Sequence, residues 1–402
     1  MPVNFTESTD LKPIAGVRLN SICAGIKRTD RDDVTLFEFI EGTTFAAVFT
    51  KNAFCAAPVE IAKQHLQRAN PRFWLINSGN ANAGTGETGK DNAKRCCSSV
   101  SILGKCEQFQ VLPFSTGVIG QPLPIEKIES ILPDLLEGLN KQHWLKAARA
   151  IMTTDTLSKG VSREIILNGK TVTITGIAKG AGMIRPDMAT MLAFIATDAK
   201  IETPILQECL KQAVEKSFNR ITIDGDTSTN DSCILAATGK SGVFINDENR
   251  ETFQTTLEEV CIYLAQSIVR DGEGATKFIT IEVLKGKTEQ ECLEVAYTIA
   301  HSPLVKTAFF ASDANWGRIL AAVGRSGVEN LDLNAVEIYL NNVCIVRNGG
   351  RAIEYTEEQG HQAMSPAEIV VQIYLHRGIS NTQVWTCDFS YDYVRINAEY
   401  RT

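Results

Sequence analysis

Residues 189–196 (A-T-M-L-A-F-I-A) constrain the fold more than any other segment, because the stretch is almost continuously apolar. A strand with one face in water alternates apolar and polar residues, whereas a strand covered on both faces does not. The stretch therefore predicts a strand that is buried on both faces.

Other segments are typical of short strands or of helices. Strands are expected at residues 45–50, 73–76, 171–175, 278–284 and 336–340, and the last meets residues 343–346 across an Asn341-Asn342 turn that predicts a hairpin. Apolar residues recur at helical spacing over residues 252–270 and in a helix that Thr203 is expected to cap. A third helical candidate, residues 125–149, contains Pro133, which we expect to break it. The alternation predicts an α/β protein with helices packed on sheets.

Length, charge and cysteine usage exclude several classes of protein. A chain of 402 residues is long enough for two or three domains, and its net charge of -7 disfavours nucleic acid or an anionic membrane as the main partner. No run of 18 apolar residues or signal-peptide pattern is present, and the 11 cysteines have no paired spacing. These features predict a cytoplasmic enzyme of small-molecule metabolism.

The segment at residues 179–192 (K-G-A-G-M-I-R-P-D-M-A-T-M-L) leads from a glycine-rich loop into the apolar stretch. Thr190 there is either an ordinary strand-edge threonine or a nucleophile, and a threonine hydroxyl needs a base. None of the five histidines lies in a recognisable catalytic string. If the Ala189–Thr190 bond were cut, the new α-amino group, with a pKa of about 7.7–8.0, could accept the hydroxyl proton. A nearby Lys179 would favour the neutral amine.

The same segment resembles a motif of the ornithine acetyltransferase (glutamate N-acetyltransferase) family of arginine biosynthesis. The resemblance extends in order along the chain. It includes N-S-G-N-A-N-A at 77–83, S-T-G-V-I-G at 115–120, T-T-D-T at 153–156, D-G-D-T-S-T-N-D at 224–231, D-G-E-G-A-T-K at 271–277, D-A-N-W-G-R at 313–318 and Y-V-R-I-N-A-E-Y-R-T at 393–402.

The resemblance implies a fold and a mechanism. The fold is a layered α-β-β-α sandwich of the N-terminal-nucleophile-like type with a smaller C-terminal α/β domain. Family members cut themselves at the position of Ala189 and Thr190, which would give an alpha chain (1–189) and a beta chain (190–402). Thr190 would then carry an acetyl group from N-acetylornithine to glutamate in a ping-pong reaction. Thr116 and Gly117 match the oxyanion hole, in which a hydroxyl and a backbone N–H donate to the tetrahedral intermediate.

The resemblance also implies binding residues and partners. Thr153, Lys179, Glu273, Asn397 and Thr402 match substrate-binding positions, together with Thr190 itself. Considered alone, Lys179 is more often a solvated loop lysine, and Ser115-Thr116-Gly117 is more often a simple turn. The family needs no metal or cofactor, and the resemblance leaves open whether acetyl-CoA is a second acetyl donor. It implies a heterotetramer of two alpha and two beta chains.

Two other functions remain open at this point. An N-terminal-nucleophile amidohydrolase or aminopeptidase would use water in place of glutamate as the acceptor. A metabolite-binding protein would never be cut and would have no nucleophile. The motifs along the whole chain favour the transferase over both.

Overall fold

The computed structural model describes residues 2–185 and 191–399 of the chain. Its contacts divide the chain into two compact units. The larger unit comprises Glu7–Asn219 and Asp226–Ile268, and the smaller unit comprises Met1–Thr6, Arg220–Gly225 and Val269–Thr402. Because the expected cleavage point at 189/190 falls within the sequence range of the larger unit, the units do not correspond to the expected alpha and beta chains.

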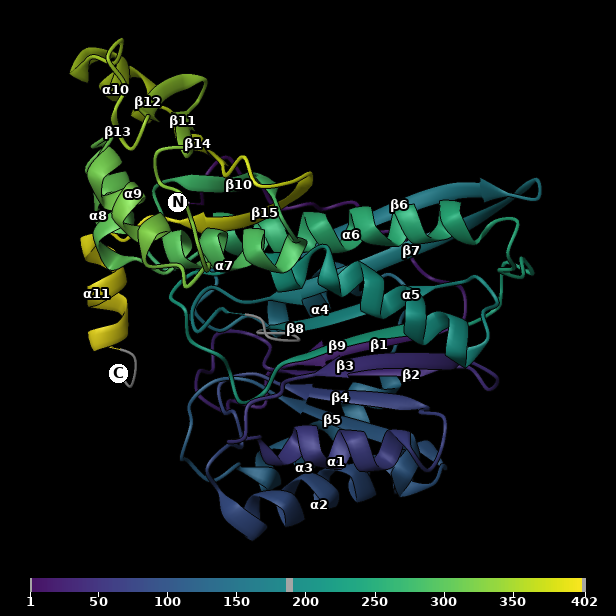
Figure 1. The fold of residues 1–402 in the computed structure, drawn as a ribbon. Helices are drawn as coiled ribbons and strands as arrows, with labels where there is room; N and C mark the ends of the chain where they lie inside the picture. The colour runs from purple at the N-terminus through teal and green to yellow at the C-terminus, as the bar shows by residue number, and fades with distance from the viewer. Residues whose placement is uncertain (1, 186–190, 400–402) are drawn as a thin grey trace. The chain divides into compact units, whose positions relative to one another are not determined.

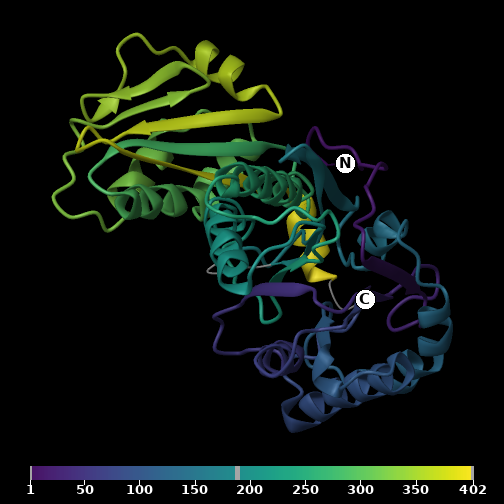
Figure 2. The same cartoon turned by 90° about the vertical axis from the view of Figure 1, so that its right-hand side faces the viewer.

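One sheet of the larger unit carries helices on its outer face. It has four strands in the order β1-β2-β4-β5, namely β1 (Val17–Ile22), β2 (Val34–Phe39), β4 (Phe73–Asn77) and β5 (Val111–Ser115). The helices are α1 (Ala57–Leu66), α2 (Gly86–Gly104) and α3 (Ile125–Glu137), with a 3-10 turn at Gln108–Gln110. Apolar side chains of strands and helices, among them Leu75, Val100 and Ile128, form one buried cluster between these two layers. Figure 2 shows these helices in its blue part, along the outer side of this unit.

The second sheet of the larger unit has five strands in the order β3-β9-β8-β7-β6. They are β3 (Thr44–Phe49), β9 (Ser232–Ala237), β8 (Leu192–Thr197), β7 (Lys170–Lys179) and β6 (Lys159–Leu167). Only β8 and β9 run parallel to each other, and every neighbouring pair besides them is antiparallel. Helices α5 (Thr203–Glu215) and α6 (Arg250–Arg270) cover the outer face of this sheet, where Leu264 of α6 packs over Gly176 of β7. The predicted apolar strand is β8, all of whose residues are buried.

An aromatic core joins the inner faces of these two sheets. The Phe194 ring of β8 lies 5.9 Å from the Phe37 ring and 5.7 Å from the Trp74 ring, centroid to centroid, and both of these come from the other sheet. The short helix α4 (Trp144–Ala150) also contributes Trp144 to this core. The larger unit therefore has four layers in the order helix, sheet, sheet, helix (Figure 1). The predicted α-β-β-α sandwich is confirmed.

The smaller unit is built on a third sheet. Its six strands follow the order β13-β12-β11-β14-β10-β15. They are β10 (Phe278–Gly286), β11 (Glu337–Leu340), β12 (Val343–Arg347), β13 (Gly350–Arg351), β14 (Glu368–Tyr374) and β15 (Ser380–Cys387). Its helices are α7 (Glu289–Ala300), α8 (Pro303–Phe310), α9 (Trp316–Gly324), α10 (Glu357–Met364) and α11 (Tyr391–Ala398), with a 3-10 turn at Phe218–Arg220 near the unit boundary. A separate apolar cluster fills this unit, which confirms the expected smaller C-terminal α/β domain.

Most of the local predictions agree with the structure. The predicted hairpin is β11–β12, and Asn341 and Asn342 have φ angles of 41° and 72°, as a type I′ turn requires. Thr203 does not cap α5, because it is already helical and Glu202 occupies the capping position. Pro133 does not break a helix, because it lies inside α3, whose buried face includes Leu132 on one side of it and Leu135 on the other.

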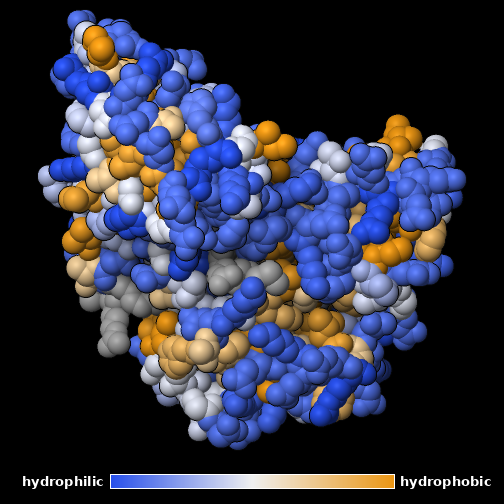
Figure 3. Space-filling view, in the orientation of Figure 1, coloured by the Kyte–Doolittle hydropathy of each residue, from blue (hydrophilic) through white to orange (hydrophobic). Residues whose placement is uncertain are grey.

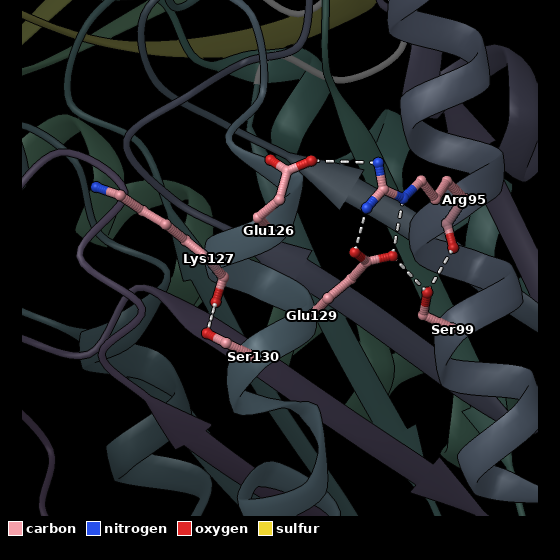
Figure 4. Close-up of polar contacts among 6 residues, drawn as sticks. All are labelled: Arg95, Ser99, Glu126, Lys127, Glu129 and Ser130. Atoms are coloured by element: carbon pink, nitrogen blue, oxygen red, sulfur yellow. Dashed lines mark hydrogen bonds and ion pairs between the residues drawn. The ribbon is translucent and has the colours of Figure 1, made fainter.

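Ion pairs on the outer layer connect α3 to α2 (Figure 4). Arg95 of α2 donates from Nε and Nη2 to the carboxylate of Glu129, at 2.9 and 2.5 Å, and from Nη1 to Glu126 at 3.2 Å. The Ser99 hydroxyl donates to Glu129 at 2.8 Å. These contacts hold the first turns of α3, before Pro133, against α2.

The face drawn in Figure 3 is mostly hydrophilic, with hydrophobic residues scattered over it. In the described ranges, no helix combines the length and the apolar character needed to cross a membrane.

Candidate active site

The predicted oxyanion hole lies where two neighbouring parallel strands end. β4 and β5 pair in register with Asn77 opposite Ser115, so the loops that follow them leave the same edge of the sheet. The Ser115 hydroxyl donates to Oδ1 of Asn77 at 2.6 Å, and the Thr116 N–H donates to the Asn77 carbonyl at 3.0 Å. The loop containing Thr116 and Gly117 is therefore tied directly to the loop that begins at Asn77.

Gly117 packs against the backbone of the neighbouring loop. Its φ angle is 134°, and a Cβ added to it would lie 2.3 Å from the carbonyl carbon of Gly79 and 2.5 Å from the nitrogen of Asn80. Such distances exclude any side chain, so both the backbone conformation and the close approach require glycine here. A simple turn can require glycine for its φ angle but does not require such a close approach to another loop. The close approach therefore favours a functional loop.

Thr116 is buried but keeps a donor available. Its residue is 8% exposed, and its hydroxyl forms no hydrogen bond within residues 2–185 and 191–399. The hydroxyl is thus available to donate a hydrogen bond to an oxygen on which negative charge develops.

A fully buried ion pair lies beside two predicted substrate residues. Nζ of Lys159 lies 2.7 Å from Oδ1 of Asp155, and both side chains are completely buried. The Thr153 N–H donates to Oδ2 of the same carboxylate at 3.0 Å, and the Gly180 N–H donates to Oδ1 at 2.7 Å. Asp155 therefore fixes the backbone at Thr153 and at the residue directly after Lys179.

The charges around this pair determine the protonation of Asp155. Burial by itself would raise the pKa of the Asp155 carboxyl, but the positive charges of Lys159 and Lys179 and the hydrogen bonds outweigh it and hold this pKa well below its usual range. Lys179 is only 9% exposed and ends β7, so it is not a solvated loop lysine. Its Cα pairs with that of Leu192, two residues after Thr190 in the sequence.

The pKa of a second buried carboxyl of the larger unit, Asp231, is shifted in the opposite direction to that of Asp155. Burial raises the pKa of Asp231 well above its usual value, and the hydrogen bonds of Ser228 and the charge of Lys179 offset only part of this effect. Asp231 is 2% exposed, and within the described residues its Oδ2 has no hydrogen-bond partner. Burial therefore favours the protonated form of this carboxyl more than in an exposed aspartate.

Two further predicted residues meet within the smaller unit. Nδ2 of Asn397, on α11, donates to Oε2 of Glu273 at 2.8 Å. Glu273 is 7% exposed, whereas Asn397 is exposed. The neighbouring Gly274 carbonyl accepts a hydrogen bond from the Ser390 hydroxyl at 2.6 Å, which ties this turn to the start of α11. Glu273 is therefore part of an ordered contact rather than of a loose turn.

Three predicted residues, Ala189, Thr190 and Thr402, lie outside the described residues. Among the residues that the structure does describe, no group of three or more His, Cys, Asp or Glu side chains is placed to hold a metal ion. The sequence analysis assigned no role to Asp155, Lys159 or Asp231. Asp155 lies in the T-T-D-T motif at 153–156 and Lys159 follows it, but nothing in the sequence indicates that they form an ion pair.

Comparison with known proteins identifies the family to which the chain belongs. The model of the ArgJ family matches residues 18–402. The chain belongs to the ArgJ family. The match contains every motif named in the sequence analysis, so the predicted resemblance is confirmed.

Individual ArgJ relatives match the chain over long ranges. The arginine biosynthesis bifunctional protein ArgJ of Pseudomonas fluorescens (strain Pf0-1) is 55% identical over 406 residues, which cover 100% of both chains. A crystal structure of the ArgJ protein of Bacillus halodurans is 39% identical with a TM-score of 0.48, over 50% of this chain and 95% of that one. The ornithine acetyltransferase of Mycobacterium tuberculosis, in complex with ornithine, is 31% identical with a TM-score of 0.39, over 46% of this chain and 96% of that one.

Proposed function

We propose that the chain transfers the acetyl group of N-acetylornithine to glutamate in arginine biosynthesis, through an ester on Thr190. The observation that carries this proposal is the loop at Thr116 and Gly117, where a hydroxyl with no hydrogen bond to the described residues lies beside a glycine that no other residue can replace. Acyl transfer passes through an oxyanion, and such donors stabilise it. Membership of the ArgJ family over residues 18–402 supports the same reaction.

The nucleophile in this proposal becomes active by self-cleavage. Hydrolysis of the Ala189–Thr190 bond gives fragments 1–189 and 190–402, and Thr190 gains an α-amino group that accepts the proton of its own hydroxyl. The hydroxyl oxygen attacks the acetyl carbon, and the ammonium proton passes to the departing nitrogen of ornithine. The amino group of glutamate then attacks the ester, which restores the Thr190 hydroxyl and gives N-acetylglutamate.

The substrate-binding residues follow from charge. N-acetylornithine and glutamate share an α-carboxylate, and the buried cation of Lys179 suits it, with Thr153 held nearby through Asp155. Only N-acetylornithine carries a side-chain ammonium, and we assign this group to Glu273, supported by Asn397. Thr402 completes the proposed set.

Three finer points belong to the same proposal. The cut fragments form a heterotetramer of two alpha and two beta chains, and the enzyme works in the cytoplasm. Acetyl-CoA is the candidate for a second acetyl donor, because the relative from Pseudomonas fluorescens is named a bifunctional protein. Formation of N-acetylglutamate from acetyl-CoA and glutamate would establish a second activity.

The first test uses a denaturing gel and an acetyl-transfer assay. The wild type should give two bands and convert N-acetylornithine and glutamate into ornithine and N-acetylglutamate, whereas Thr190→Ala should give one band and no product. Release of free acetate at the same rate with and without glutamate would instead establish the hydrolase alternative. A single inactive band for the wild type would establish the binding-protein alternative.

The second test addresses the oxyanion hole. Thr116→Val removes the hydroxyl while keeping the shape, and kcat should fall by about 10²–10³-fold. Thr256→Val is the matched control, because Thr256 is also buried and its hydroxyl bonds only to the α6 backbone. Equal kcat values for the two variants would contradict the role of Thr116.

A further inference from the structure

Asn230 is a buried side chain that the proposed mechanism does not use. It directly precedes Asp231 and the start of β9, and it is 6% exposed. Its Nδ2 donates to the Ala81 carbonyl at 2.6 Å and to the Ser115 carbonyl at 2.9 Å, while its Oδ1 accepts from the Thr229 hydroxyl. Both N–H groups of one amide therefore bind the two loops that form the candidate oxyanion hole.

The bond to Ser115 controls the orientation of Thr116. The Ser115 carbonyl and the Thr116 N–H belong to one planar peptide group. Asn230 holds the carbonyl side of this plane, and the Asn77 carbonyl holds the N–H side at 3.0 Å. The peptide that leads into the oxyanion-hole residue is thus restrained from both sides.

The bond to Ala81 restrains the surface against which Gly117 packs. Ala81 follows Gly79 and Asn80, whose backbone atoms approach Gly117 most closely. The Ala81 N–H also donates to the Val118 carbonyl at 3.0 Å. Any shift of Asn230 therefore changes both loops together.

The other end of the same segment is bound to Met191, the residue directly before β8. The Ser232 N–H donates to the carbonyl of Met191 at 2.9 Å, and Met191 directly follows Thr190 in the sequence. The Asn230–Ser232 segment has only three residues and spans at most about 10 Å. It links the oxyanion loops to β8 by a short connection that hydrogen bonds hold at both ends.

We propose that Asn230 is a positioning residue for acyl transfer, which sets the distance between the oxyanion hole and the Thr190 nucleophile. This inference rests on the proposed function. Attack and oxyanion stabilisation occur on adjacent atoms of one carbonyl group, so both groups must be aligned together. A displacement of about 1 Å costs about 10²-fold in rate. Asn230 touches neither substrate in this account, so its loss lowers kcat and leaves substrate binding nearly unchanged.

The test compares two variants of Asn230 with a matched control. Asn230→Asp keeps the shape but removes the donors, and Asn230→Ser leaves room for water and is the second variant if the first folds poorly. Asn249→Asp is the control, because Asn249 is also 6% exposed and its Nδ2 donates to the Phe244 carbonyl at 3.0 Å in another loop of the same unit. Melting temperature, self-cleavage, kcat and KM are measured for the full-length protein.

We expect both Asn230 variants to lower kcat by about 10–100-fold with little change in KM for either substrate. Asn249→Asp should lose stability without this change in kcat per folded molecule. The inference is overturned if the Asn230 variants, corrected for folded fraction, keep the kcat of the control, or if KM alone changes. Failure of the wild type to transfer acetyl groups would refute the proposed function, and that result is separate from the comparison of variants.

Discussion

Replacement of Asp155 by asparagine tests the electrostatic account of the larger unit most directly. The substitution keeps the side-chain shape and one acceptor oxygen in place of two, but it leaves the completely buried ammonium of Lys159 without the Asp155 carboxylate as its counterion. Breaking a buried ion pair from one side destabilises a protein by about 3–5 kcal/mol. For a unit of this size we expect the melting temperature to fall by about 6–20 °C.

A double-mutant cycle separates the unpaired charge from other effects of the substitution. Lys159→Met alone should also destabilise, because it leaves the Asp155 carboxylate buried with less positive charge around it. The double variant removes both charges and keeps one of the two hydrogen bonds that the Thr153 and Gly180 N–H groups donate, because asparagine has a single acceptor oxygen. It should therefore be more stable than either single variant, with a coupling of about 1–3 kcal/mol by urea denaturation.

The pH dependence and a surface control complete this experiment. Because the folded-state pKa of Asp155 is lowered, its stabilisation is present above the unfolded pKa of about 3.9 and is lost as pH falls towards the folded pKa. The difference in the free energy of unfolding between the wild type and Asp155→Asn should therefore become smaller in acid. Asp10→Asn is the control, because Asp10 pairs with Lys12 at 3.1 Å in an exposed position and should contribute at most about 1 kcal/mol. A similar loss at both sites, or no coupling to Lys159, would refute the reasoning.

Three other substitutions give separate outcomes. Gly117→Ala places a Cβ 2.3 Å from the Gly79 carbonyl carbon, so kcat should fall by at least about 10²-fold, and wild-type turnover would contradict the close packing. Asp231→Asn mimics the protonated carboxyl. Because the folded-state pKa of Asp231 is raised, the wild type loses stability as pH rises, so the variant should have a higher melting temperature than the wild type at alkaline pH and lose this advantage in acid. A difference in melting temperature that does not change with pH would contradict the raised pKa. Glu273→Gln should raise KM for N-acetylornithine about 10-fold without affecting KM for glutamate, and equal effects on both substrates would exclude pairing with the ornithine ammonium.

The sequence predicted the parts of the structure that have local causes. The apolar run identified β8, and the Asn341-Asn342 pair identified a hairpin, because backbone conformation and burial leave local patterns. Thr116 and Gly117 were predicted from family motifs, but the reason that residue 117 must be glycine lies in Gly79, which is 38 positions earlier in the sequence. A contact between distant loops leaves no periodic signal in either of them.

Long-range polar contacts account for what the sequence analysis missed. Nothing in the sequence indicates that Asp155 and Lys159 are buried, since charged side chains are usually exposed, and only the fold reveals it. Asn230 has an amide that is common in turns, and its two acceptors lie more than a hundred residues before it. Pro133 shows the opposite case, because α3 continues through it with buried apolar residues on both sides, where local propensity predicted a break.

The strand order of the five-stranded sheet has a consequence for any break in the chain between Lys179 and Leu192. The two strands after such a break, β8 and β9, lie between β3 on one side and β7 and β6 on the other, all of which precede it. The pieces could separate only by breaking hydrogen-bonded ladders along both edges of the β8–β9 pair. Cut molecules would therefore not exchange partners with one another under native conditions. Each pair of fragments would remain the product of one original chain, so mixing two differently tagged cut proteins should yield no alpha fragment paired in this sheet with the beta fragment of another chain.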